Sequence, residues 1–109
     1  MLALTREDLL PKMLGEVPLA LVYIGGETCR ICHSVEPKLA ALLAEHFPKL
    51  LAVAVDRDRF PAIAAQWSVF SVPAILIFEG EKERRRFSGA FGLNDVGAAL
   101  ERPYEQVFG

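Results

Sequence analysis

Two short, uninterrupted apolar runs constrain the fold of this chain more than any other feature. Residues 19–24 and 50–55 each contain only apolar or aromatic side chains over the length of one strand. A strand with one face in solvent alternates apolar and polar residues, so runs without alternation are typical of strands buried on both faces. Such strands occur mainly in parallel sheets covered by helices, and parallel neighbours need a long connection between them.

The segment between the two runs is predicted to be that connection, as a long amphipathic helix. It extends from Cys29 to Phe47, and charged residues occupy the faces that the apolar residues leave free. The apolar residues at helical spacing are Val35, Leu39, Leu42, Leu43 and Phe47. Together, the runs and the helix predict a β-α-β unit with parallel strands.

Shorter elements are expected on either side of this unit. They are a strand at 2–4, a helix over 6–14, a helix over 59–67, strands over 72–78 and 82–88, and a helix over 94–100. The last two strands are separated by a turn around Gly80 and predict an antiparallel hairpin. Thr5 and Asn94 are the expected helix caps, and Pro103 begins a tail to which no structure is assigned. This order predicts one α/β domain over residues 1–109.

Composition and charge narrow the class of protein. The 109 residues are 52% apolar and 24% charged, which is typical of a globular chain rather than a disordered one. The net charge of -2 creates no positive field, so nucleic acid is not an expected partner. The apolar runs fall far short of the ~20 residues that cross a bilayer, and no signal-peptide pattern opens the sequence. We therefore expect a cytoplasmic monomer that binds no membrane.

The chain has two cysteines, and their position indicates chemistry. Cys29 and Cys32 form a C-x-x-C motif directly after a predicted strand and at the start of the longest helix. Unpaired backbone N–H groups and the helix dipole stabilise an anion there, which favours a thiolate at Cys29. Arg30 adds a favourable positive charge, whereas Glu27 opposes it. Cys29 is the expected nucleophile, and Cys32, one turn later, the thiol that resolves a mixed disulfide.

A C-x-x-C motif also occurs in zinc sites, in haem attachment sites and in structural disulfides. Cys29, Cys32, His33 and His46 are possible zinc ligands, but the two histidines are 13 residues apart on one predicted helix, about 20 Å along its axis. No metal site is therefore predicted. The string C-x-x-C-H also fits haem attachment, which needs export and a second ligand that nothing indicates. A purely structural disulfide is disfavoured because so small a loop removes little entropy from the unfolded chain.

The sequence resembles the thioredoxin family over nearly its whole length. Besides the C-x-x-C motif, Pro37 lies eight residues after Cys29, as in the family's kinked active-site helix. Val72 and Pro73 stand where the family has a cis-proline beside the cysteines, and Gly89 follows the last strand as the family's glycine does. The resemblance implies the thioredoxin fold: a central mixed sheet of four to five strands, flanked by helices on both faces.

Several positions depart from the family pattern. Thr28 replaces the tryptophan before the first cysteine, and Arg30 and Ile31 replace Gly-Pro between the cysteines. Tyr23 stands in place of the buried aspartate, and Ala52 in place of a nearby lysine. The family's proton acceptor for the second cysteine is therefore missing, and solvent or a neighbouring glutamate is left to replace it.

The resemblance also implies function and partners. It implies a thiol-disulfide oxidoreductase that needs no cofactor and acts on protein disulfides or low-molecular-weight thiols, with a reductase as electron donor. Substrate contacts are expected at Thr28, Arg30, Ile31, Val72 and Pro73. The alternative is a module without turnover that binds a partner or senses redox state through the same disulfide.

Two further features have a functional and a structural interpretation. Arg84, Arg85 and Arg86 form a basic run, which is either a patch for an acidic partner or, in an edge strand, a defence against aggregation, and the second interpretation is preferred. Trp67 is expected in the core at the end of its helix, whereas Phe70, closer to Pro73, is a candidate for the rim of the substrate site.

Overall fold

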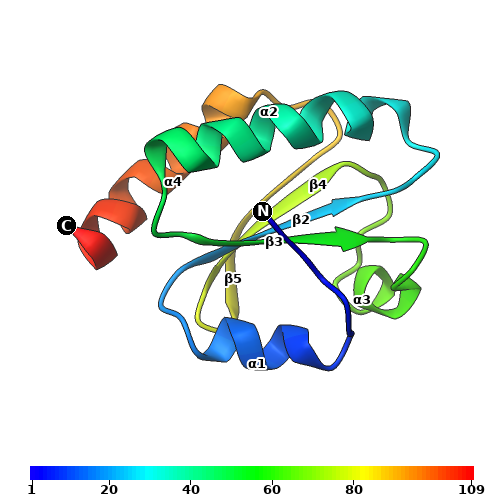
Figure 1. The fold of residues 1–109 in the computed structure, drawn as a ribbon, viewed down its shortest axis with the longest axis horizontal. Helices are drawn as coiled ribbons and strands as arrows, with labels where there is room; N and C mark the ends of the chain where they lie inside the picture. Colours follow the sequence, from blue (N-terminus) through cyan, green and yellow to red (C-terminus); the bar gives the residue numbers. More distant parts are fainter.

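A mixed five-stranded sheet forms the centre of the computed structural model, which describes residues 1–109 (Figure 1). The helices and strands are, in chain order, β1 (Leu2–Ala3), α1 (Leu9–Gly15), β2 (Ala20–Gly25), α2 (Arg30–His46), β3 (Leu51–Asp56), α3 (Pro61–Gln66), β4 (Ala74–Glu79), β5 (Lys82–Ser88) and α4 (Leu93–Phe108). The strand order is β1-β3-β2-β4-β5. β1, β3 and β2 are parallel, whereas β4 and β5 run antiparallel to their neighbours.

Helices cover both faces of the sheet, as the uninterrupted apolar runs predict (Figure 1). Along β2, Ala20, Val22 and Ile24 pack on the side of α1 and α3. Leu21 and Tyr23 alternate with them and pack on the side of α2 and α4. All five residues are at most 2% exposed, because each face of the strand meets its own layer of helices.

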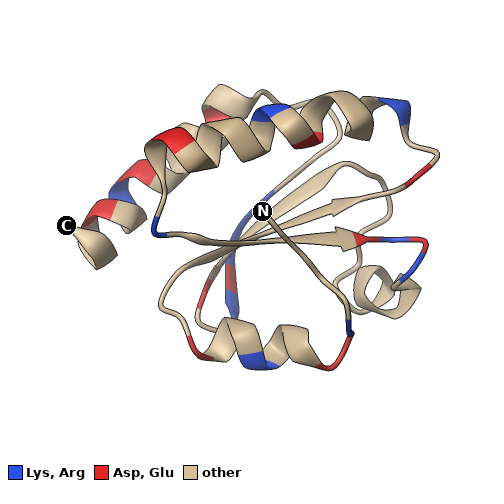
Figure 2. Cartoon of the chain, in the orientation of Figure 1, with Lys and Arg blue, Asp and Glu red and all other residues tan.

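Charged residues are confined to the outside of this structure. Figure 2 shows them on the outer helices, on β5 and in the loops, while β2, β3 and β4 carry charge only at the ends of strands. No helix combines the length and the apolar character needed to span a membrane.

The elements expected from sequence are present, with corrections at some ends. α1 begins at Leu9, not Arg6: Asp8 precedes it without a side-chain cap, because its carboxylate pairs with Arg6 at 2.7 Å. α4 begins at Leu93 rather than after Asn94, and its first turn is capped by Asp95, whose carboxylate accepts from the Gly92 N–H at 3.1 Å.

The end of α4 is the largest difference from expectation. Pro103 does not begin a tail, because the helix continues through it to Phe108. Tertiary contacts offset the hydrogen bond that proline removes. The Tyr104 ring packs edge-on against Phe47 at 5.1 Å, and its hydroxyl accepts from the Lys49 N–H at 3.0 Å. The last turns of α4 thus secure the connection between α2 and β3.

The basic run lies on β5, at the edge of the sheet. Each arginine has a partner within the chain, which agrees with a protective role at an exposed edge. The partners are Glu79 for Arg84, the Phe87 ring for Arg85, and Glu83 with the carbonyls of Trp67 and Ser68 for Arg86.

We expect Tyr104→Ala to lower the free energy of unfolding by about 2 kcal/mol, since a half-buried ring and a hydrogen bond are lost. Tyr104→Phe is expected to cost only about 1 kcal/mol, because the ring contacts remain. Val107→Ala, on an exposed position of the same helix, is the control and is expected within about 0.5 kcal/mol of wild type. Urea unfolding measures all three, and a stability of Tyr104→Ala equal to wild type contradicts the role of this helix end.

Candidate active site

The Cys29 sulfur caps the helix that carries the dithiol. Cys29 is the N-cap residue of α2, with extended backbone angles, and its Sγ accepts a hydrogen bond from the Cys32 N–H at 3.1 Å. Serine, threonine, aspartate and asparagine usually supply the acceptor at this position. A thiolate here receives a backbone N–H and the positive end of the helix dipole together.

The two cysteines have different environments. They form a disulfide in the structure, with their Cα atoms 5.2 Å apart. Cys29 is half-buried at the surface, whereas Cys32 is only 3% exposed and belongs to the core on the α2 side of the sheet. The two cysteines therefore differ in burial, and only Cys29 is open to a large molecule.

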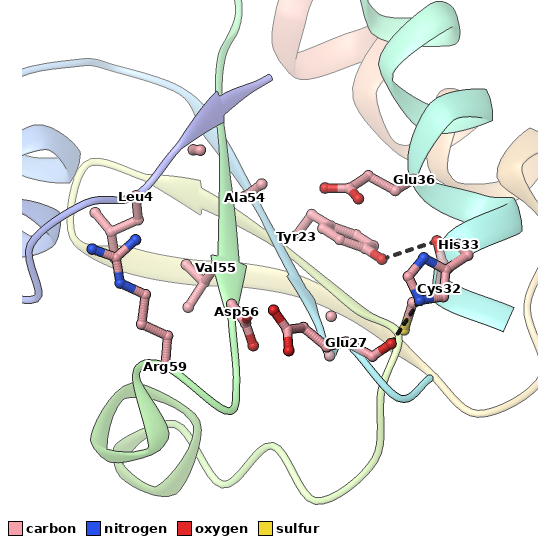
Figure 3. Close-up of a pocket in the computed structure, with 13 residues that line it drawn as sticks. Leu4, Tyr23, Glu27, Cys32, His33, Glu36, Ala54, Val55, Asp56 and Arg59 are labelled. Carbon is pink, nitrogen blue, oxygen red and sulfur yellow. Dashed lines mark hydrogen bonds between the residues drawn. The ribbon is translucent and has the colours of Figure 1, made fainter. Parts of the chain in front are cut away.

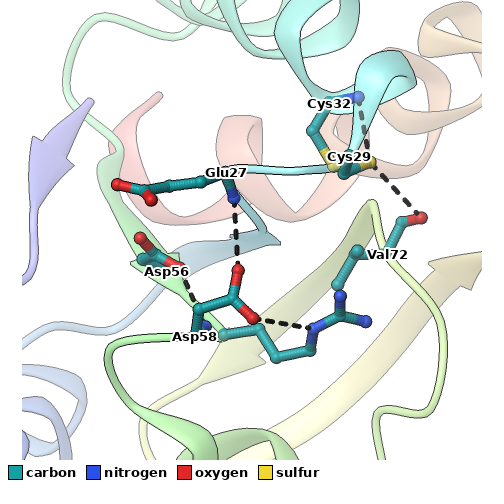
Figure 4. Close-up of polar contacts among 7 residues, drawn as sticks. Glu27, Cys29, Cys32, Asp56, Asp58 and Val72 are labelled. Carbon is teal, nitrogen blue, oxygen red and sulfur yellow. Dashed lines mark hydrogen bonds and ion pairs between the residues drawn. A yellow bond between two sulfur atoms is a disulfide. The ribbon is translucent and has the colours of Figure 1, made fainter.

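The loop before β4 lies against the dithiol. The Val72 carbonyl oxygen is 3.8 Å from the Cys29 Sγ (Figure 4). The Val72–Pro73 peptide bond is cis, and Pro73 is buried while Val72 is half-buried. The structure thus brings together two segments more than 40 residues apart in sequence.

The other expected substrate residues lie exposed around the sulfur. Thr28 and Arg30 are exposed, and Ile31 is 65% exposed despite its apolar side chain. Phe70, in the loop that leads to Pro73, is 88% exposed. Trp67 differs from it, because its half-buried ring packs on Phe78 with ring centroids 5.0 Å apart. The structure therefore separates the two aromatics: Trp67 is half-buried and packs against the core, and Phe70 lies at the surface.

Tyr23 lies beneath the dithiol. It is 2% exposed, and its hydroxyl donates to the Cys32 carbonyl oxygen at 3.4 Å (Figure 3). Burial, and secondarily the negative charge of Glu36, raises the pKa of Tyr23 to about 12. The phenol consequently stays neutral wherever thiols exchange near neutral pH, so it is a hydrogen-bond donor and not a charged base.

Gly25 makes room for the Tyr23 ring. A Cβ atom on Gly25 would lie 2.6 Å from the Tyr23 hydroxyl oxygen and 2.9 Å from two ring carbons. Side chains two residues apart in a strand point to the same face, so the ring runs along β2 over the glycine. In the sequence, Gly25 marks only the end of a strand, and its spacing of two residues from Tyr23 is the signal that would indicate this contact.

A cavity of about 300 Å³ opens beside the buried cysteine (Figure 3). Tyr23 and Cys32 line it, together with the charged residues Glu27, Glu36, Asp56 and Arg59. The strand register pairs Tyr23 with Ala54, which also lines the cavity. The expected neighbour, Ala52, instead pairs with Leu21, so Ala54 occupies the position beside Tyr23. A volume of this size admits several water molecules.

The loop between β2 and α2 is held by the segment that follows β3. The Arg57 N–H donates to the Gly25 carbonyl oxygen at 2.8 Å. The Asp58 carboxylate accepts from the Glu27 N–H at 3.3 Å, and Asp56 in turn accepts from the Asp58 N–H at 2.8 Å (Figure 4). Parallel strands bring their carboxyl ends to one edge of the sheet, which is why these loops meet.

The residues considered as metal ligands are not gathered into one site. No group of three or more His, Cys, Asp and Glu side chains has an arrangement that could hold a metal ion. His33 Nε2 lies 2.7 Å from the Glu27 carbonyl oxygen, and His46 lies at the far end of α2, 3.9 Å from a carboxylate oxygen of Glu45.

A dithiol at the start of a helix, with a proline loop packed against its exposed sulfur, defines the class of thiol-disulfide exchange proteins. Residues 3–102 match the sequence profile of the family described as Thioredoxin. A thioredoxin 1 from Chlorobaculum tepidum is 30% identical over 106 residues, covering 97% of this chain and 91% of that protein. The chain belongs to the thioredoxin family.

Further similarities support this assignment. A thioredoxin from Chlamydia trachomatis is 38% identical over 83 residues, which are 76% of this chain and 78% of that protein. The X-ray structure of Fasciola hepatica thioredoxin matches with a TM-score of 0.84 and 30% identity, covering 94% of this chain and 98% of that one. The fold, the family and the thiol-disulfide oxidoreductase class expected from sequence are thereby confirmed.

We expect Gly25→Ala to lower the free energy of unfolding by about 1–3 kcal/mol, because the added methyl group overlaps the Tyr23 ring in a packed core. Gly97→Ala is the matched control: its Cβ atom would meet only Leu42 at 3.9 Å, within helix α4. Alanine is the better helix former, so this change is expected to stabilise by about 0.5–1 kcal/mol. Equal effects of the two substitutions in urea unfolding contradict the contact between Tyr23 and Gly25.

Proposed function

We propose that this protein reduces disulfides in other proteins, with Cys29 as the nucleophile and Cys32 as the resolving thiol. The Cys29 thiolate attacks one sulfur of the substrate disulfide, forming a mixed disulfide and releasing a substrate thiolate that takes up a proton. Cys32 then loses its proton and attacks Cys29, which releases the second substrate thiolate. The substrate gains two electrons and two protons, and the Cys29–Cys32 disulfide forms.

The single observation that carries this proposal is the hydrogen bond from the Cys32 N–H to the Cys29 sulfur. It directs a backbone donor at the more exposed of the two sulfurs, which is the one that a substrate can reach. The buried Cys32 is within disulfide distance of that sulfur and out of reach of a protein substrate.

Thr28, Arg30, Ile31, Val72 and Pro73 are proposed as the substrate contacts. The Val72 carbonyl beside the Cys29 sulfur suits an extended substrate segment, which offers backbone N–H donors. The exposed Ile31 and Phe70 add apolar contact area, so we extend the proposed surface to Phe70.

We also propose that the chain forms a single domain and acts as a cytoplasmic monomer. In this proposal it requires no cofactor and binds neither nucleic acid nor a membrane. A reductase or a low-molecular-weight thiol returns two electrons to the disulfide after each turnover. The proton of Cys32 leaves through the cavity beside it, which is lined by the neutral phenol of Tyr23 and by the carboxylates of Glu27, Glu36 and Asp56.

The direct experiment is insulin reduction by dithiothreitol with catalytic amounts of the protein. An oxidoreductase accelerates precipitation of the insulin B chain, whereas a module without turnover leaves the rate at that of dithiothreitol alone. Cys29→Ser is the control for contaminating activity and is expected to abolish the acceleration. No acceleration by the wild-type protein would contradict the proposal.

We expect Cys32→Ser to accumulate mixed disulfides with substrates, because the resolving thiol is missing while Cys29 remains reactive. With insulin or another protein that carries disulfides as the substrate, the adducts are detected by mass spectrometry and disappear on addition of dithiothreitol. Cys29→Ser serves as the matched control and should form few adducts, since Cys32 is 3% exposed. More adducts on Cys29→Ser than on Cys32→Ser would reverse the two assignments.

We expect Phe70→Ser to raise KM for insulin about five- to thirtyfold with little change in kcat, since burying an aromatic ring contributes about 1–2 kcal/mol to association. Reduction of a small disulfide such as oxidised glutathione should stay unchanged, because it does not reach that far from the sulfur. Val107→Ser removes an exposed apolar side chain elsewhere and is the control. An equal loss of activity with insulin and with oxidised glutathione would indicate that Phe70 maintains the structure of the site and does not recognise the protein substrate.

A further inference from the structure

His33 is a polar side chain at the site that the exchange chemistry does not use. It follows Cys32 in the first turns of α2, and its side chain is exposed. Its Nε2 atom lies 2.7 Å from the carbonyl oxygen of Glu27 (Figure 3). A carbonyl oxygen only accepts, so Nε2 carries the hydrogen and donates. Side chains in a helix lean toward its N-terminus, which brings this ring over the preceding loop.

The Glu27 backbone is held on both sides by other segments. Its N–H donates to the Asp58 carboxylate at 3.3 Å, and its carbonyl accepts from His33 at 2.7 Å. Glu27 is two residues before Cys29 in a short exposed loop, whose remaining internal contact is the Cys29 N–H to the Gly26 carbonyl at 3.2 Å. Fixing Glu27 therefore fixes the direction from which the chain reaches the reactive sulfur.

Reduction removes the covalent tie between this loop and the helix. Besides the disulfide, three hydrogen bonds link the loop to the first turns of α2 in the structure. They are Cys32 N–H to Cys29 Sγ at 3.1 Å, His33 N–H to the Cys29 carbonyl at 3.4 Å, and His33 Nε2–H to the Glu27 carbonyl at 2.7 Å. The last is the shortest, and the histidine ring makes it.

We propose that His33 is a positioning residue for the reduced dithiol. Its ring N–H holds Glu27 so that the Cys29 sulfur stays on the Cys32 N–H after the disulfide has opened, and the thiolate keeps its backbone donor. The inference rests on the proposed role of Cys29 as the nucleophile. This role gives the histidine after the second cysteine a function that needs neither a metal ion nor a haem.

The test is the pH profile of Cys29 alkylation by iodoacetamide in the reduced full-length protein, for wild type, His33→Ala, His33→Gln and His46→Ala. Glutamine places an amide N–H the same number of bonds from the backbone as histidine Nε2, without a positive charge.

We expect His33→Ala to shift the midpoint of the profile up by about half to one pH unit, so that alkylation at pH 6 slows about three- to tenfold. His33→Gln should stay within about twofold of wild type. His46→Ala, at the other end of α2, should match wild type.

Charge is the competing explanation, and the glutamine variant separates it from hydrogen bonding. Other charged groups face the same region, namely Arg30 one turn before His33 and the cavity residues Glu27, Glu36, Asp56 and Arg59, and they are the same in every variant. A His33→Gln profile that follows His33→Ala would overturn the proposal in favour of charge. A His33→Ala profile equal to wild type would overturn it outright. Equal alkylation of Cys29 and Cys32 in the wild-type protein would instead remove the proposed nucleophile, and is seen without any variant.

Discussion

The hydrogen bond from the Cys32 amide to the Cys29 sulfur joins the fold of this protein to its chemistry. A helix leaves its first N–H groups without partners, and an N-cap side chain normally satisfies one of them. Here the acceptor is the sulfur itself, so the same donor completes the helix and stabilises a thiolate. Leu39 and Leu43 anchor α2 in the core, and the sheet thereby determines where that donor points.

The site assembles from three loops at one edge of the sheet. The loops after β2 and β3 meet because those strands are parallel, and Arg57 and Asp58 bind the backbone ahead of the dithiol. The third segment, before β4, places the Val72 carbonyl on the other side of the sulfur. The loops are held to one another by the backbone hydrogen bond from Arg57 to Gly25 and by side chains that bind backbone groups, such as the Asp58 carboxylate on the Glu27 N–H. The geometry therefore depends on the topology and on a few loop side chains together.

Patterns that are local in sequence predicted most of this structure. The apolar runs predicted two-sided burial, which β2 shows along its whole length, whereas β3 is fully buried only on the face of Val53 and Val55 and half-buried on the face of Ala52 and Ala54. The C-x-x-C motif located the dithiol at the start of α2. Such patterns do not specify which residues from distant parts of the chain contact each other. Ala52 and Ala54 lie on the same face of β3, because a shift of the pairing register by two residues leaves the face unchanged. The apolar pattern therefore does not say which of them pairs with Tyr23, and the observed register places Ala54 there. Similarly, Pro103 ends a helix by local rules, and the packing of Tyr104 on Phe47 overrides them.

The ring of Tyr23 lying over Gly25 makes the sizes of these two residues depend on each other. A large residue at 23 demands the smallest residue at 25, whereas a small acid at 23 would free the space above the strand and allow a side chain at 25. A change at either position alone therefore passes through an overpacked or an underpacked intermediate. Among relatives of this chain, the size of the residue at 23 is expected to vary inversely with that at 25.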